Sequence, residues 1–60
     1  MMPLTAREKE ILEKVSNGYL IKQIGNEHTV KNHLVSVRKK LHAQTNSHAV
    51  RIGINGGIIK

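Results

Sequence analysis

The fold of this chain is decided by residues 27–41, EHTVKNHLVSVRKKL. Four apolar residues in this stretch recur at intervals of four, three and four, and they are Val30, Leu34, Val37 and Leu41. That spacing puts them on one side of an α-helix, within an arc of about 60° that would face a core. Asn26 precedes the stretch and is a favourable N-cap. The pattern therefore predicts a helix from about Glu27 to Leu41.

The opposite side of this helix carries donors, an amide and one apolar group, namely His28, Lys31, Asn32, Val35, Arg38 and Lys39. Such a set suits the major groove of DNA: Lys donates to guanine, Asn bonds adenine, and a Val methyl contacts the thymine methyl. Arg38 and Lys39 would lie over phosphates, which fix register without reading sequence. The alternative is that this basic side is only solvated.

The segment before this helix predicts two shorter ones. Residues 5–8, Thr-Ala-Arg-Glu, form a capping box that starts a helix ending near Asn17. Gly18 then occupies the position that tolerates left-handed geometry. Residues 19–24 predict a second helix with Leu20, Ile21 and Ile24 on one side, and Gly25 ends it.

A fourth helix is expected from about Ser47 to Asn55, capped by Thr45, Asn46 or Ser47. Its apolar and small residues spread over about 200° of the circumference, and they are Ala49, Val50, Ile52, Gly53 and Ile54. Either the tail Ile58-Ile59 covers this arc or a second copy does. We predict a dimer interface at Ala49, Val50, Gly53 and Ile54. With no strand alternation, the fold class is all-α, with four short helices.

Charge is distributed unevenly along the chain. The 60 residues contain 10 Lys+Arg and 4 Asp+Glu, a formal charge of +6. Residues 1–27 sum to zero, whereas residues 28–60 contain six bases, all four His and no acid. Four of those six bases belong to the third helix: Lys31, Arg38, Lys39 and Lys40. A polyanionic partner is indicated.

Composition argues against several other classes. Cysteine is absent, so no disulfide or thiolate zinc site exists. The single aromatic, Tyr19, makes a stacking platform for single strands improbable. No apolar run approaches the ~20 residues of a membrane span. The His residues have no metal-ligand spacing and no hydroxyl has a recognisable base, so we expect no enzyme, no metal and no cofactor. A cytoplasmic location is the default.

Several motifs in order resemble the LuxR/GerE-type helix-turn-helix domains, the output modules of NarL-type response regulators. They are Leu4-Thr5-Ala6-Arg7-Glu8, Lys22-Gln23-Ile24, Thr29-Val30-Lys31-Asn32-His33, Lys39-Lys40-Leu41, Ala49-Val50 and Gly57-Ile58-Ile59. The resemblance covers residues 4–59, which we take as one domain. It implies a bacterial transcription regulator in which the third helix enters the major groove and the fourth forms a homodimer contact. A receiver or ligand-sensing domain would precede it in a longer chain.

The resemblance also assigns roles. Lys31, Asn32 and Val35 match base-facing positions, and Thr29 and Lys39 match backbone contacts. Glu8 matches a carboxylate that pairs with a base inside the domain, which agrees with its place on the apolar side of the first helix.

The chain departs from the family at two places. The interval from Gly18 to Thr29 is about five residues shorter than usual, so a normal helix-turn-helix turn is hard to build. Either residues are missing or the second helix is truly short, and a tight hinge favours domain swapping. Asn46 also replaces a common Arg and Gly53 a common Ala. The competing hypothesis is a small helical dimerisation or protein-interaction module that does not bind DNA specifically.

Overall fold

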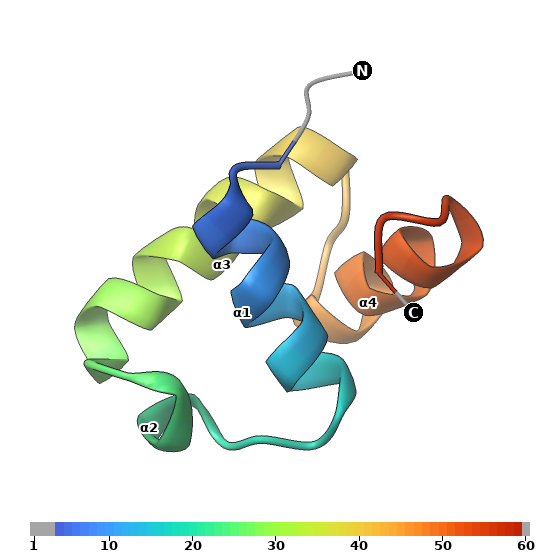
Figure 1. The fold of residues 1–60 in the computed structure, drawn as a ribbon. Helices are drawn as coiled ribbons and strands as arrows, with labels where there is room; N and C mark the ends of the chain where they lie inside the picture. Colours follow the sequence, from blue (N-terminus) through green and yellow to red (C-terminus); the bar gives the residue numbers. More distant parts are fainter. Residues whose placement is uncertain (1–3, 60) are drawn as a thin grey trace.

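The computed structural model describes residues 4–59, which fold into four α-helices without a strand in that range (Figure 1). The helices are α1 (Ala6–Ser16), α2 (Ile21–Ile24), α3 (Glu27–Leu41) and α4 (Asn46–Asn55). The prediction of an all-α chain with four short helices is confirmed. None of these helices has the length and apolar character needed to cross a membrane. Lys60, one of the six bases of the second half, lies outside the described residues.

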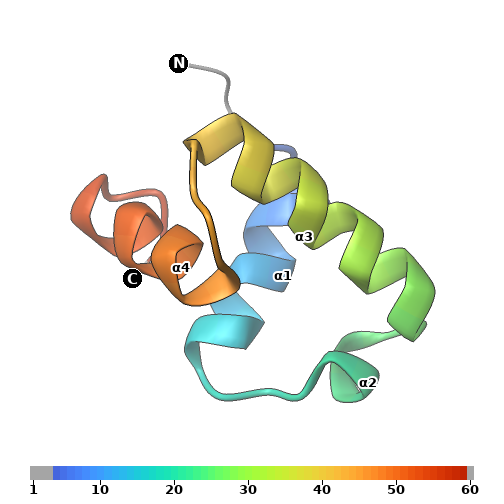
Figure 2. The same cartoon turned by 180° about the vertical axis from the view of Figure 1, so that it is seen from behind.

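Helix α1 is the centre of the packing. Its neighbouring residues Ile11 and Leu12 are both fully buried but belong to different apolar clusters. Ile11 joins Ile24, Val30 and Leu34, under α2 and the first half of α3. Leu12 joins a second cluster with Val37, Leu41, Ala49 and Ile59. Figures 1 and 2 show α1 between α3 and α4, with α2 beside the start of α3. The four predicted core residues of α3 are all buried.

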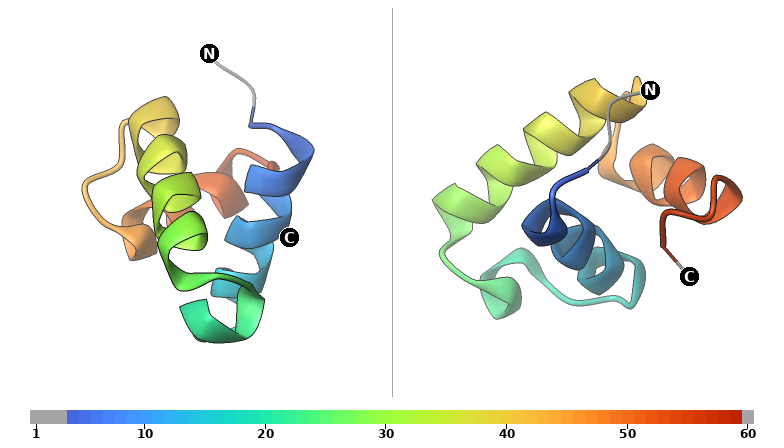
Figure 3. Two further views of the ribbon diagram at one scale, coloured as in Figure 1. Left: turned by 90° about the vertical axis from the view of Figure 1, so that its left-hand side faces the viewer. Right: turned by 45° about the horizontal axis from the view of Figure 1, so that its top comes forward.

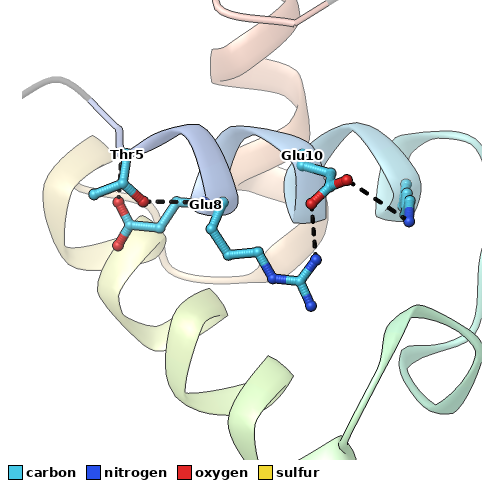
Figure 4. Close-up of polar contacts among 5 residues, drawn as sticks. Thr5, Glu8 and Glu10 are labelled. Carbon is cyan, nitrogen blue, oxygen red and sulfur yellow. Dashed lines mark hydrogen bonds and ion pairs between the residues drawn. The ribbon is translucent and has the colours of Figure 1, made fainter.

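Local capping rules account for the helix starts. Thr5 Oγ1 accepts from the Glu8 amide at 3.1 Å, and Glu8 Oε1 accepts from the Thr5 amide at 2.9 Å (Figure 4). Asn26 Oδ1 accepts from the Thr29 amide at 3.1 Å, as expected. Thr45 caps α4 by accepting from the His48 amide at 3.0 Å. Because Thr45 is the cap, α4 begins at Asn46 instead of Ser47.

The second helix is shorter than predicted, a single turn that starts at Ile21. The amide of Tyr19 donates to the Lys14 carbonyl, so Tyr19 still belongs to the end of α1. Leu20 was predicted to lie on the same side of this helix as Ile24. Instead it is the N-cap and its side chain is exposed, whereas Ile24 is buried. Only Gly25 and Asn26 separate α2 from α3. The short interval is therefore compatible with a packed domain.

The tail after α4 completes the core. The chain turns at Gly57, whose φ is +73°, and returns so that Ile59 lies against α1 and α4 (Figure 3). Ile59 is 4% exposed. A Cβ at Gly53 would lie 3.1 Å from both Ile59 Cγ1 and Leu12 Cδ2, so this glycine leaves little room between α4, α1 and the tail. Of the two explanations for the wide apolar arc of α4, coverage by the tail accounts for Ala49 and Gly53.

Candidate nucleic-acid interface

Helix α3 exposes the side that is opposite its buried apolar residues. All the residues predicted to contact bases are exposed there: Lys31, Asn32 and Val35. Among the predicted backbone contacts, Thr29, His28 and Lys39 are exposed and Arg38 is half-buried. Val35 is 38% exposed, an apolar group among donors. The structure thus gathers these seven residues on one helix whose other side is fixed in the core.

Two contacts along α3 involve these residues. Asn32 Nδ2 lies 3.4 Å from His28 Nε2, a spacing of four residues that aligns neighbouring side chains on a helix. Asn32 retains Oδ1 and the second Nδ2 hydrogen, the pair needed for adenine. Lys31 Nζ lies 3.7 Å from the exposed Glu27 carboxylate. Such an exposed pair is weak, so Lys31 stays available to another acceptor.

A groove of about 280 Å³ runs beside this exposed side, between α2, α3 and the start of α4. Ile21, Leu34 and Val35 give it an apolar floor, and Lys31 and Arg38 give it positive edges. Asn46 also lines it, and its buried Oδ1 accepts no hydrogen bond from residues 4–59. The short α2 and Asn46, two places where the chain departs from the family pattern, thus border the same groove.

Lys40 belongs to α3 but does not lie on its exposed basic side. Its Nζ donates to Glu8 Oε1 at 2.7 Å, and its side chain is only 20% exposed. Successive residues on a helix turn by about 100°, so Lys40 points away from Lys39 toward α1. The interior partner expected for Glu8 is therefore Lys40, and three bases remain outward.

The environment of Glu8 stabilises its charged form. Burial on its own would raise the pKa of this carboxyl group, which is 4% exposed. Hydrogen bonds from Lys40, the Thr5 amide and Ser36, together with the Lys40 charge, outweigh burial and lower the pKa to about 2. Glu8 is therefore a structural anion that joins α1 to α3.

The predicted dimer residues of α4 divide into two pairs. Ala49 is fully buried and Gly53 is also buried, both against residues of the same chain. Leu12 and Ile59 of the same chain occupy the side on which these two residues lie, and a partner contact at Ala49 and Gly53 stays a prediction. Ile54 is 48% exposed, whereas Val50 is half-buried and packs against the edge of the cluster around Leu12.

Residues 4–59 contain no group of three or more His, Cys, Asp or Glu arranged to hold a metal ion. The order of elements, a scaffold helix, a short helix and then an exposed basic helix, is that of helix-turn-helix DNA-binding domains, with a two-residue link between α2 and α3 in place of their usual three to four residues. A family model described as "Bacterial regulatory proteins, luxR family" (GerE) matches residues 2–52. The chain belongs to this family, whose domain is a DNA-binding module of transcription regulators. Neither the curated proteins nor the solved structures contain a match to this sequence.

Proposed function

We propose that residues 4–59 form one domain that binds double-stranded DNA in a sequence-specific way, with α3 in the major groove. The main observation behind this proposal is the exposed side of α3. The side chains of Lys31, Asn32 and Val35 are exposed there, while the opposite side of the helix is buried. Lys31 would donate to guanine, Asn32 would pair with adenine, and Val35 would contact a thymine methyl.

The remaining positive and polar groups of α3 would hold the DNA backbone. Thr29 and His28 lie at the start of α3, and Arg38 and Lys39 lie two to three turns later. Contacts at both ends would fix the register of the helix in the groove. Phosphate neutralisation would supply most of the affinity, which would therefore fall with salt.

The decisive experiment is selection from a random duplex pool at two salt concentrations, with sequencing of the bound fraction. A recovered motif supports base reading. Lys31→Ala and Asn32→Ala should relax that motif, each losing about 1–3 kcal/mol on it. Lys39→Ala should weaken all duplexes alike, and Lys9→Ala, an exposed base on α1, serves as the matched control. If Lys31→Ala and Asn32→Ala lost as much affinity for scrambled duplexes as for the selected motif, the assignment of these residues to base reading would be contradicted.

A second candidate role is self-association through α4, because Ile54 is a large, half-exposed apolar side chain beside Val50. In the combined proposal, a homodimer formed by Val50 and Ile54 reads a two-fold repeated site. Sedimentation of the wild type and Ile54→Asp tests it. Self-association that is independent of salt, without any duplex binding, would instead favour the protein-interaction module.

The setting of the domain is also a proposal. A charged domain of a bacterial regulator fits the cytoplasm, where it would reach the chromosome, and a receiver or ligand-sensing domain would supply its signal.

A further inference from the structure

A second groove, of about 410 Å³, lies at the C-terminal end of α3. It is formed between the last turn of α3 and the chain that turns back after α4. Its lining includes Lys39, Leu41, His42, Ile52, Gly56 and Ile58. This volume is within the range of grooves that bind small molecules or side chains of a partner.

The floor of the groove is apolar and incompletely covered. Leu41 is 7% exposed, while Ile52 and Ile58 are half-buried at the edge of the cluster around Leu12. An aliphatic or aromatic side chain placed over them would extend that cluster outward. The floor therefore favours an occupant with large apolar side chains.

Two lysines line the edge of the groove, and the charge of one of them, Lys39, is not balanced by an acid of residues 4–59. Lys39 is exposed and forms no ion pair within residues 4–59. Lys40 is already bound to Glu8, and residues 28–60 contain no Asp or Glu. The edge therefore favours an occupant that carries carboxylates near its apolar group.

The groove is separate from the other two surfaces. Lys39, the first groove residue along α3, lies one turn (about 6 Å) beyond Val35, the last residue proposed to read bases. On α4, Ile52 is about 160° around the helix from Val50, on the other edge from the proposed dimer contact. Lys39 is the one residue that the groove shares with a proposed DNA contact.

We propose that this groove binds a segment of another protein in which one or two large apolar side chains are flanked by Asp or Glu. A second copy of this chain fits poorly because it offers few free carboxylates: it has 4 Asp+Glu, and one of them, Glu8, is buried against Lys40. Its exposed acids also have partners, Glu10 with Arg7 and Lys14 and Glu27 with Lys31. DNA fits poorly because its backbone has no apolar side chain for the floor. The partner class is therefore an acidic, apolar peptide segment.

The test is a titration of the isotope-labelled 60-residue chain with a synthetic peptide of two adjacent Leu flanked by Asp and Glu. Amide shifts should concentrate at Leu41, His42, Gly56 and Ile58. Two control peptides, with Lys for the acids or Ser for the leucines, should bind more weakly. Lys39→Gln should weaken binding of the acidic peptide about three- to five-fold, whereas Lys9→Gln should leave it unchanged.

Several results would overturn the proposal. No shift at millimolar peptide, or equal binding of the Lys peptide, would show that the groove does not select acidic apolar segments. Shifts centred on Val50 and Ile54, or on Lys31 and Asn32, would place the peptide on a different surface. Duplex binding is measured separately, so failure of this proposal leaves the DNA-binding proposal to its own test.

Discussion

Lys40 Nζ donates a 2.7 Å hydrogen bond to Glu8 Oε1, which links the last turn of α3 to the first turn of α1. The same oxygen accepts from the Thr5 amide at 2.9 Å, so one carboxylate both closes the cap of α1 and holds α3. The two residues are 32 positions apart in sequence. This contact stabilises the relative position of the scaffold helix and the basic helix, and it separates a structural lysine from its exposed neighbour.

Replacing Lys40 by Met should lower the free energy of unfolding by about 2 kcal/mol, because a buried carboxylate loses its charged donor. The control is Lys14→Met, since Lys14 lies 4.0 Å from the exposed Glu10 (Figure 4). That change should cost less than about 0.5 kcal/mol. Urea denaturation followed by circular dichroism measures both. Equal losses would show that the buried pair contributes no more than the exposed one.

Stability should decrease in acid because of Glu8. Its pKa is about 2 in the folded chain, compared with 4.5 for the unperturbed group. The folded state therefore holds the proton less tightly. The stabilisation is complete above pH 4.5 and is lost as the pH falls through about 2, on the order of 3 kcal/mol in total. Between neutral and acidic pH, the urea midpoint of Glu8→Gln should change less than that of the wild type. Equal changes in the two proteins would contradict the assignment.

Lys39 and Lys40 are neighbours in sequence but should behave differently toward DNA. Lys39→Met should reduce the slope of log K against log salt by about 0.9, as expected for one lost phosphate contact. Lys40→Met should leave the slope unchanged, because this lysine binds Glu8. Fluorescence anisotropy with a labelled duplex at several salt concentrations, below the unfolding temperature of each variant, tests this. A reduced slope for Lys40→Met would mean that the lysine leaves Glu8 when DNA binds.

A larger side chain at Gly53 should disrupt the core. Even a Cβ there would lie 3.1 Å from Ile59 Cγ1 and Leu12 Cδ2. Gly53→Leu should therefore destabilise the chain by about 1–3 kcal/mol through overpacking. Arg51→Leu, at an exposed position of the same helix, should change stability by less than about 0.5 kcal/mol. Thermal unfolding measures the stability of both variants. If the stability of Gly53→Leu were unchanged, the tail would be able to move away at little cost.

The features that were predictable from sequence depend on neighbouring residues. The apolar spacing in α3 predicts its buried side, and Thr5, Asn26 and Thr45 are the caps that short-range rules favour. The exposed side of α3 follows directly, because it is the complement of the buried one.

The remaining features depend on contacts between distant segments. The direction of Lys40 is set by Glu8, and the burial of Ala49 and Gly53 is set by Leu12 and Ile59. Periodicity cannot show which of two apolar sides the chain itself will cover. The predicted start of α2 at Tyr19 was wrong because the Tyr19 amide donates to the Lys14 carbonyl at the end of α1. Composition does not reveal which of the two helices Tyr19 joins.

The burial of Ile59 has a consequence for how the domain is made. Leu12 is synthesised well before Ile59, the residue that supplies one wall of its site. Until residue 59 has emerged from the exit tunnel, the cluster around Leu12 stays open to water and to chaperones. The core around Leu12 is therefore completed only after Ile59 has been synthesised, and until then the nascent chain leaves that cluster without one of its walls.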